Sequence, residues 1–497
     1  MVTLSPMDAP TGAKARRSTL AALVAAAFLG LALRMATVLF IAPLNSYLPD
    51  HLDMMAWSAY AFEHGAHNLY DFRRGSGVVA RYRLSSGEVV TSPLPAHAYN
   101  YPPASAYGIW LQGALWTALD GEIVTRPVSA RFRERIGADT VTSRVINTPA
   151  ARFAQSLPSV ALDFVLAAGV AALVGALRHA SRWARPELAA FATTLLAPPI
   201  LLDSAFWNQI DSWVSAGLVW TLWAALRERW WLAGALYGVA LLTKPQAILL
   251  GPTLLVVAAA LRWGEGGTWR RVALLGKSMA AVLLTVVVIA APFTIADAKK
   301  PEGPLRWFER SYPETIARVQ GGTTFNAFNA WWLQWMAAGA SLAERDSAKA
   351  MLGTSRQTAG MALFASGIIT ALALVATRGR LRRETWVASA YLVCLAAFAL
   401  PTGVHERYVY YCLPFLIALA ALDRKRWLTP LVLLCVVGFF EMTSFGWVTL
   451  VDGAVEAGAR TAGSLLALMT LAAFAYSLIA FATWPAPAAE RSHPLRK

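Results

Sequence analysis

Residues able to do chemistry gather in four short clusters, each at the edge of a long apolar stretch. Each cluster combines carboxylate, amide or basic side chains. The clusters are Asp50-His51-Leu52-Asp53, Phe206-Trp207-Asn208-Gln209-Ile210-Asp211, Thr243-Lys244-Pro245-Gln246 and His405-Glu406-Arg407-Tyr408. An Asp at the centre of a membrane helix costs roughly 2.5–3.5 kcal/mol on insertion scales. The clusters therefore favour a membrane protein that handles a polar substrate over one that only anchors a partner.

The first cluster offers a candidate catalytic base. A carboxylate on an outer helix beside the membrane can take a proton from an attacking hydroxyl group. Asp53 is the preferred catalytic residue, and Asp50 is the second candidate. Asp50 follows Pro49 at the start of a helical pattern and could also serve only as a helix N-cap. Both interpretations of Asp50 stay open.

The last cluster and Lys244 offer candidate ligands for the phosphate of a donor molecule. Arg407 has a permanent charge and the forked hydrogen-bonding geometry that suits phosphate, and His405 and Lys244 could assist it. Glu406 could orient either of its neighbours. The structural alternatives are an interfacial charge cluster and, for Lys244, a side chain that snorkels to the lipid headgroups.

Amide, carboxylate and aromatic side chains near these clusters could bind a sugar or an acceptor, because a sugar needs hydrogen-bonding groups at fixed angles. The alternative is a polar helix end that lipid headgroups satisfy. The candidate sugar or acceptor ligands are Asn208, Gln209, Asp211, Gln246, Glu406, Tyr101, Asn326 and Asn329.

No metal and no cofactor are expected. The sequence contains no cluster that resembles a metal cage and no phosphate-binding loop of the Walker or dinucleotide-binding type. Its three cysteines, Cys394, Cys412 and Cys435, fall inside apolar stretches at no spacing typical of a disulfide or metal framework. They are expected to be small core residues.

The composition places the chain in a membrane. Of its 497 residues, 57% are hydrophobic and 15% are charged, whereas soluble domains contain about 25% charged residues. Apolar stretches of about 20 residues recur along the chain, which predicts an all-α polytopic transmembrane bundle of about 12–14 spans. The candidate spans lie near 19–42, 103–119, 156–177, 187–203, 212–226, 231–243, 247–261, 272–293, 359–377, 386–401, 409–422, 427–447 and 463–483, with a shorter apolar piece near 325–338.

A single transmembrane domain is predicted over 19–484, between cytoplasmic tails at 1–18 and 485–497. Its two long outer loops are 43–102, which would carry the catalytic residues, and 294–325.

Both outer loops contain helical patterns. The first has a helix pattern from Leu52 to Glu63, closed by Gly65. The second predicts short interfacial helices interrupted at Pro313. The basic stretch 127–152 predicts a polar loop or a partly disordered insert.

The net charge of +15 is better explained by the orientation of the chain in a membrane than by nucleic-acid binding, because the basic residues lie in short loops. Cytoplasmic loops collect Lys and Arg, so the N-terminus is expected in the cytoplasm and the polar clusters on the opposite face. Segments 120–154 and 178–186 both contain Arg, and strict alternation cannot place both inside. Whether 103–119 crosses the membrane therefore stays open. Arg34, inside the first span, could face the polar cavity or snorkel outward.

Six motifs in order carry a family resemblance. They are Asp53 with Trp57, Tyr101-Pro102-Pro103, Trp207-Asn208-Gln209-Ile210-Asp211, Thr243-Lys244-Pro245-Gln246, Asn326-Ala327-Phe328-Asn329-Ala330-Trp331 and His405-Glu406-Arg407-Tyr408. The chain thus resembles the polyprenyl-phosphate-sugar-dependent glycosyltransferases of the GT-C superfamily, in particular the bacterial group related to GPI mannosyltransferase 2. Asn208 stands where that pattern has Gly, and the stretch from Arg73 to Tyr99 is longer than usual.

The resemblance implies a GT-C-like bundle with outer juxtamembrane helices in the bacterial inner membrane. The implied reaction is the inverting transfer of one hexose from a polyprenyl-phosphate carrier to a lipid or glycan acceptor. Mannose is the preferred candidate for the hexose, and the reaction is expected on the periplasmic or exterior face. Asp53 would be the base, and the expected partners are the carrier, the acceptor and membrane lipids, with no nucleic acid.

Two alternatives remain at this stage. A transporter or lipid flippase would also combine many spans with buried polar groups, although such proteins usually contain internal repeats. Another polyprenyl-linked transferase, moving a different sugar or a larger glycan, would share the same motifs.

Overall fold

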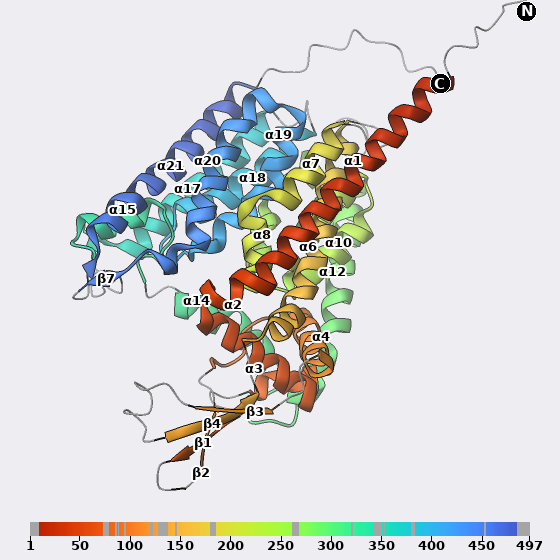
Figure 1. Cartoon of the computed structure of the whole chain (residues 1–497). Coiled ribbons are helices and arrows are strands. Elements are labelled where there is room, and N and C mark those ends of the chain that lie inside the picture. Colours follow the sequence, from red (N-terminus) through yellow and green to blue (C-terminus); the bar gives the residue numbers. More distant parts are fainter. Residues whose placement is uncertain are drawn as a thin grey trace, which may run out of the picture.

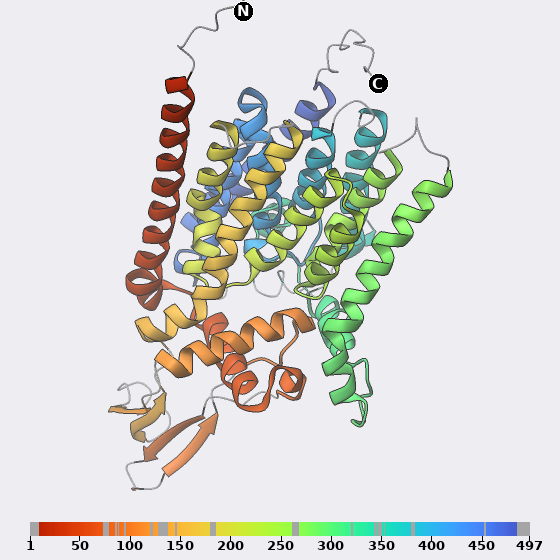
Figure 2. The ribbon, with the colours of Figure 1, turned by 90° about the vertical axis from the view of Figure 1, so that its right-hand side faces the viewer.

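Helices dominate the computed structural model of the chain (Figure 1). The structure describes residues 9–72, 79–84, 87, 89–93, 96–119, 123–127, 138–144, 147–178, 185–260, 268–319, 322–341, 345, 350–351, 353–378, 383–451 and 454–484. Most helices run side by side as a bundle, and a smaller layer of helices and strands covers one end of it (Figure 2). The all-α membrane bundle expected from the sequence is confirmed.

Five helical segments in the described part of the chain are long and apolar enough to cross a membrane. The number becomes six if α7 and α8, which bend by 48° at Ala197, form one span. The long helices are α1 (Ala9–Ala36), continued by a π-helical turn (Thr37–Ile41) and α2 (Ala42–Asn45), then α6 (Pro149–Leu177), α12 (Thr268–Asp297), α17 (Arg356–Arg378) and α21 (Ala457–Ala482).

Shorter helices fill the bundle between the long ones. They match the positions of the remaining candidate spans, but several are broken or short. They are α7 (Arg185–Leu196), α8 (Pro198–Ala205), α9 (Asp211–Leu226), α10 (Trp230–Leu241), the 3₁₀ helix Pro245–Leu250 with α11 (Gly251–Ala260), α15 (Ala330–Ala337), α18 (Glu384–Ala399), the 3₁₀ helix Glu406–Cys412 with α19 (Leu413–Leu422), and α20 (Arg424–Met442).

The helix α4 (Pro103–Leu119) lies across the end of the bundle rather than along it (Figure 2). It packs against α3 (Leu48–His64), and the side chain of Gln112 ties it to α6 through a 2.6 Å hydrogen bond to the carbonyl of Gln155. The stretch 103–119 therefore does not run as a span in this structure, which answers the question that its sequence left open.

The predicted helix in the first outer loop is confirmed and is longer than expected. Helix α3 begins at Leu48 and ends at His64, and Gly65 follows with φ of 89°. The 3₁₀ helix Ala66–Asp71 continues from it. The second outer loop forms α13 (Arg306–Ser311) and α14 (Pro313–Val319), so the predicted break at Pro313 is also confirmed.

A four-stranded antiparallel sheet extends from the same end of the bundle (Figure 1). Two separate excursions of the chain build it, one on each side of α4, in the order β2-β1-β4-β3. Its strands are β1 (Val79–Leu84), β2 (Val89–Pro93), β3 (Ile123–Pro127) and β4 (Ala138–Arg144). Where the structure describes 127–152, it contains β4 and the start of α6, so the prediction of a polar loop is wrong there. Two-residue strands form two further ladders, β5 (Ala350–Met351) with β6 (Thr354–Ser355) and β7 (Leu450–Val451) with β8 (Ala454–Val455).

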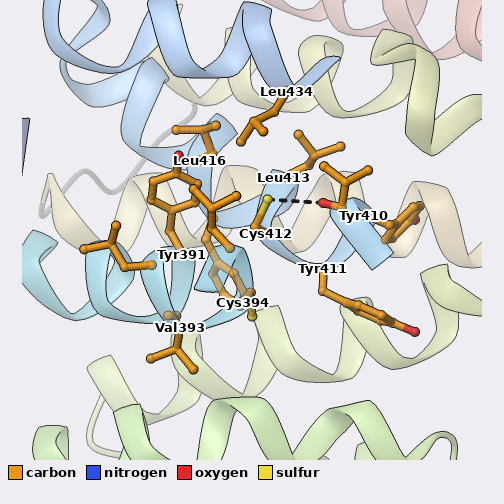
Figure 3. Packing of buried hydrophobic residues seen from close by; sticks show 14 of the residues in the cluster. Tyr391, Val393, Cys394, Tyr410, Tyr411, Cys412, Leu413, Leu416 and Leu434 are labelled. Carbon is orange, nitrogen blue, oxygen red and sulfur yellow. Dashed lines mark hydrogen bonds between the residues drawn. The ribbon is translucent and has the colours of Figure 1, made fainter. Parts of the chain in front are cut away.

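The C-terminal half of the bundle has an apolar core shared by α18, α19 and α20 (Figure 3). Cys394 and Cys412 lie inside it, and the Cys412 thiol donates to the carbonyl of Val409 at 3.1 Å. Both cysteines are the core residues that the sequence predicted. Cys435 is only partly buried.

Arg34 is fully buried between helices, so neither expectation for this residue is correct. Its guanidinium donates to the Asp163 carboxylate at 2.7 Å and to the carbonyls of Gly30 and Leu195. The hydroxyl of Ser204 also donates to Asp163, at 2.5 Å. This ion pair joins α1 to α6 and α7 inside the apolar bundle.

Replacing Gly113 by alanine is expected to destabilise the outer layer by about 1–3 kcal/mol, the usual cost of overpacking. A Cβ at this position would lie 2.0 Å from the backbone carbonyl oxygen of Ser58 in α3. Because that atom belongs to a helix backbone, α3 itself must move. The thermal melting of purified protein and its activity should both fall.

The matched control is Gly276→Ala in α12, where a Cβ meets nothing within 4 Å. This variant should melt at or slightly above the wild-type temperature, since glycine costs about 0.5–1 kcal/mol in a helix relative to alanine. Equal melting of both variants would contradict the tight contact between α3 and α4.

Candidate functional site

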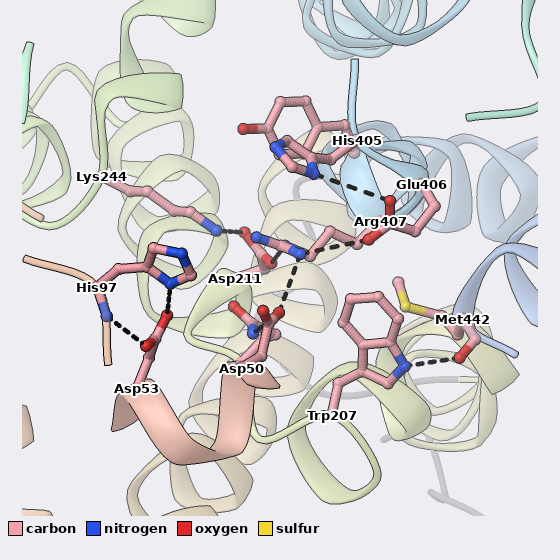
Figure 4. A network of polar contacts seen from close by, with 12 residues as sticks. Asp50, Asp53, His97, Trp207, Asp211, Lys244, His405, Glu406, Arg407 and Met442 are labelled. Atoms are coloured by element: carbon pink, nitrogen blue, oxygen red, sulfur yellow. Dashed lines mark hydrogen bonds and ion pairs between the residues drawn. The ribbon is translucent and has the colours of Figure 1, made fainter. Parts of the chain in front are cut away.

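The N-terminal part of α3 brings Asp50 to the centre of a polar network (Figure 4). The N-cap position of α3 is Tyr47, with no side-chain cap bond, and Asp50 lies within the first turn. Its carboxylate instead accepts from the Gln209 amide at 2.8 Å and from the Arg407 guanidinium at 3.3 Å. The N-cap interpretation of Asp50 is therefore wrong.

Asp53, one turn further along α3, binds His97 twice. Its Oδ1 accepts from the backbone N–H of His97, and its Oδ2 lies 2.8 Å from His97 Nδ1. Trp57 Nε1 donates to the carbonyl of His97 at 2.7 Å. The segment that precedes α4 is thereby fixed to α3 at a single residue.

Arg407 is the common partner of three carboxylates from different parts of the chain. Its nitrogens lie 3.3 Å from Asp50, 3.4 Å from Glu406 and 3.7 Å from Asp211. The guanidinium also lies over the ring of Trp207, 5.5 Å from its centre. These contacts are longer than the roughly 2.7–2.9 Å of a tight charged hydrogen bond, which leaves its donors able to engage a ligand.

Asp211 and Lys244 form a buried ion pair behind Arg407. Both side chains are almost fully buried, and Tyr411 donates its hydroxyl to the same Asp211 carboxylate. Lys244 is 2% exposed and lines neither of the two polar cavities described below. The pair holds the start of α9 against the residues that follow α10.

His405 stacks on Phe325, with ring centres 4.7 Å apart and planes 14° from parallel. The backbone supports this contact, because Phe325 N donates to Val404 O and Glu406 N donates to Phe325 O. His405 Nδ1 lies 3.8 Å from the Glu406 carboxylate. The segments before α15 and after α18 therefore meet beside Arg407.

Two polar cavities, each of about 290 Å³, are both lined by Arg407. They share Asp50, Phe325, His405 and Arg407. The α3 cavity is lined in addition by Asp53, Met54, Trp57, His97, Asn100, Tyr101, Gln209 and Thr315. The α20 cavity is lined in addition by Tyr47, Trp207, Asn326, Arg345, Glu406 and Ser444.

An apolar groove of about 570 Å³ lies along α20, on its side toward the junction of α7 and α8. Leu428, Val432, Val436 and Phe440 are among its lining residues. Two residues after α20, Ser444 lines the α20 cavity. The groove and the α20 cavity thus lie along one continuous stretch of chain.

The carboxyl group of Asp50 has a raised pKa. Burial is the main cause, and the nearby Arg407 charge only partly offsets it. Asp50 is therefore easier to protonate than a carboxyl group in water.

Eight of the thirteen residues singled out from the sequence line a described cavity. They are Asp50, Asp53, Tyr101, Gln209, Asn326, His405, Glu406 and Arg407. The other five are Asn208, Asp211, Lys244, Gln246 and Asn329, none of which lines either cavity.

Two of those five have plain structural roles in place of the predicted sugar contact. Asn329 is the N-cap of α15, where its side chain accepts from the backbone of Trp331 and Trp332 and donates to Phe398. Asn208 adopts φ of 61° and is buried. That left-handed conformation explains why glycine would suit the position, since few other residues adopt it without strain. Gln246 donates its amide to the Tyr408 hydroxyl at 2.6 Å.

Sequence reasoning missed His97, Thr315 and Arg345 as cavity residues. His97 comes two residues before the Tyr99-Asn100-Tyr101 segment, which was the only local signal for it. In the described part of the chain, no three His, Cys, Asp or Glu side chains lie close enough together to hold a metal ion.

Known proteins give three comparisons with this chain. The family model "Glycosyltransferase family 87" matches residues 145–403, just over half of the chain. No curated protein matches. Similar solved structures include ArnT from Cupriavidus metallidurans bound to undecaprenyl phosphate and in the apo state, with 15% identity each and TM-scores of 0.46 and 0.43. These alignments cover 92% of this chain and 75% and 76% of the ArnT chains.

The family match agrees with the site. The motifs after α8 and after α10 lie within the matched residues, where Asp211 pairs with Lys244. Arg407, which lies 3.7 Å from Asp211, follows four residues beyond the match. The prediction of a glycosyltransferase with a helical membrane fold is confirmed, and this chain belongs to glycosyltransferase family 87.

Proposed function

We propose that this protein transfers one hexose, mannose first among candidates, from a polyprenyl-phosphate carrier to a hydroxyl group of a lipid or glycan acceptor. The observation that carries this proposal is the pair of cavities that meet at Arg407. A transferase needs two substrates face to face, and holding them in line supplies much of the rate.

The donor would occupy the α20 cavity. Arg407 and His405 line it, and the apolar groove along α20 reaches Phe440, four residues before Ser444 in its wall. A polyprenyl chain suits such a groove, and its phosphate would then meet the guanidinium of Arg407.

The acceptor would occupy the α3 cavity. Its wall combines Asp53, Gln209, Asn100 and the rings of Trp57 and Tyr101, a mixture of polar and aromatic groups that suits a sugar or polyol. Asp53 supplies the negative charge that draws the proton from the attacking hydroxyl.

The leaving group needs no acid. The leaving group is polyprenyl phosphate, whose phosphate is already ionised. The site therefore has to stabilise its negative charge rather than donate a proton to it. Arg407 can do this in a partly dry cavity, where such interactions are worth far more than in water.

The site would face the non-cytoplasmic side of a bacterial inner membrane. Helices α7 and α20 begin with basic residues, at Arg185 and at Arg424-Lys425-Arg426, at the end of the bundle where α1 begins. Basic residues collect on the cytoplasmic side. The α3 layer lies at the other end (Figure 1), and its Asp50 lines both cavities.

The test is sugar transfer by purified protein from polyprenyl-phosphate mannose to a membrane lipid extract. Wild type is expected to make a new glycolipid, and Asp53→Asn is expected to lose at least about 100-fold in rate. The matched control is Glu63→Gln, an exposed carboxylate on the same helix, which should transfer at the wild-type rate.

Other polyprenyl-phosphate sugars are offered in parallel, which separates the choice of sugar from the class of reaction. Transfer from glucose or arabinose carriers alone would keep the reaction and replace mannose. A wild-type protein that is folded and transfers from no carrier would overturn the proposal.

A further inference from the structure

The Asp53 carboxylate is poorly placed to take a proton by itself. Both of its oxygens already accept hydrogen bonds from His97, Oδ1 from the backbone and Oδ2 from the ring. Its side chain is 13% exposed, whereas the His97 side chain is 72% exposed. Both groups line the α3 cavity, and the imidazole is by far the more exposed of the two.

The partner of His97 Nδ1 decides which ring nitrogen can accept a proton. An ionised carboxylate only accepts hydrogen bonds, so Nδ1 must carry the hydrogen that it shares with Asp53 at 2.8 Å. In a neutral imidazole the other nitrogen, Nε2, then has the free lone pair. A carboxylate that orients a histidine in this way also stabilises the imidazolium that forms when Nε2 is protonated.

The backbone of His97 is fixed on both sides. Its N–H donates to Asp53, and its carbonyl accepts from Trp57 Nε1 at 2.7 Å. Asp53 and Trp57 lie one turn apart on α3. The helix therefore places the imidazole at the wall of the α3 cavity although the histidine lies in a loop.

We propose that His97 Nε2 is the atom that takes the proton from the acceptor hydroxyl, and that Asp53 acts through it as a positioning residue. This inference rests on the proposed function. The acceptor O–H proton passes to Nε2 as its oxygen forms a bond to the anomeric carbon. The bond from that carbon to the phosphate oxygen breaks, and its electron pair leaves with the polyprenyl phosphate. The exposed imidazolium then releases its proton to water.

The charged groups around the cavity support this division of roles. Asp53 faces the imidazole directly, and Asp50, His405 and Arg407 line the other side of the cavity. Arg407 is paired with Asp50, Glu406 and Asp211, and among the residues that the structure describes no contact between Arg407 and His97 or Asp53 competes with the pairing of those two residues.

His97→Ala is expected to lower kcat by about 100- to 10,000-fold, the usual contribution of a general base. The KM for the donor should stay within about threefold of wild type, because the donor side of the site is untouched. Imidazole added to the His97→Ala variant should restore transfer in a concentration-dependent way, since the removed ring leaves an open space beside Asp53. His97→Gln keeps a hydrogen bond to Asp53 but should be as inactive as His97→Ala and should gain nothing from imidazole.

The control is His67→Ala, which removes an exposed histidine of the same outer layer and should transfer normally. The double variant Asp53→Asn with His97→Ala should be no slower than His97→Ala alone, because residues that act as a unit are not additive. If His97→Ala and His97→Gln keep wild-type kcat while Asp53→Asn is inactive, Asp53 takes the proton itself and the inference fails.

Nuclear magnetic resonance of protein with labelled histidine gives a readout that needs no activity. The His97 signal, assigned by its loss in His97→Ala, should show a neutral ring with the hydrogen on Nδ1. In Asp53→Asn the Asn amide can donate to the ring, so the hydrogen should move to Nε2. Hydrogen on Nε2 in the wild type would overturn the inference. Absence of transfer by wild type from any carrier would overturn the proposed function and, with it, the catalytic role of His97.

Discussion

Arg407→Ala is expected to lower kcat/KM for sugar transfer by about 100- to 1,000-fold, the loss seen when one preorganised donor to a developing charge is removed. Arg407 lies where the two cavities meet, and its contacts to Asp50, Glu406 and Asp211 are 3.3 to 3.7 Å long. Such loose contacts let the guanidinium turn toward a phosphate. Its loss should raise the donor KM and lower kcat, because phosphate charge is present in the donor and grows as the bond breaks.

Arg407→Lys separates charge from geometry. A lysine keeps one positive charge but lacks the forked donors that match phosphate, so it should recover only part of the lost rate. If it recovers all of it, bidentate contact with phosphate is not required.

Removing Arg407 also takes away a positive charge that three carboxylates share. The stability of the variant must therefore be measured separately from its activity. Thermal melting of Arg407→Ala should fall only modestly, since Asp211 keeps Lys244 and Tyr411 and Asp50 keeps Gln209. The matched control is Arg227→Ala, which removes an exposed arginine at the end of α9 away from the site. This variant should keep full activity. Full activity of Arg407→Ala would place the donor phosphate elsewhere.

The apolar pattern predicted the bundle but could not tell a crossing helix from a covering one. Helix α4 has 17 residues of high apolar content, like a span. One part of its surface packs against α3, α6 and α12, while Tyr107, Trp110 and Leu111 stay exposed. No local pattern distinguishes such a covering helix from a span. Arg34 gives a second example. It can be buried because the Asp163 carboxylate, 129 residues away in the sequence, accepts its hydrogen bond.

Motif spacing found the right segments of the site but not the direction of each side chain. His405, Glu406 and Arg407 are consecutive, and all three line a cavity. Asn326 and Asn329 belong to one motif, yet Asn326 faces the α20 cavity while Asn329 caps a helix. A spacing of three residues at the start of a helix cannot distinguish a cap from a ligand.

His97 could not be found from the sequence because its partner is 44 residues away. The sequence places Lys244 and Asp211 in separate polar clusters with different expected roles, whereas in the fold the ammonium pairs with the Asp211 carboxylate. Whether a basic side chain pairs with a carboxylate of the protein or stays available to a ligand depends on contacts between distant segments. Such pairing is a property of the folded state alone.

The buried ion pair of Arg34 and Asp163 is expected to make each single substitution worse than the double one. Breaking a buried pair costs about 3–5 kcal/mol because it leaves one charge without a partner. Asp163→Leu should be the more harmful, since arginine cannot lose its charge in a protein, whereas a stranded Asp163 can take up a proton. Arg34→Leu leaves Asp163 with the Ser204 hydroxyl as its remaining donor.

Melting of the purified variants in detergent tests this order. Asp163→Leu should melt roughly 3–5 °C below wild type, Arg34→Leu less far below, and the double variant nearer to wild type than either. Replacing a buried pair by apolar residues is often neutral or stabilising, and inside an apolar bundle the two leucines meet α1, α6 and α7 without any unpaired charge. Sugar transfer by the double variant should equal wild type, because Arg34 and Asp163 line neither cavity. If the double variant is the least stable, the pair contributes more than its two charges cost to bury, and it anchors α1 in the bundle.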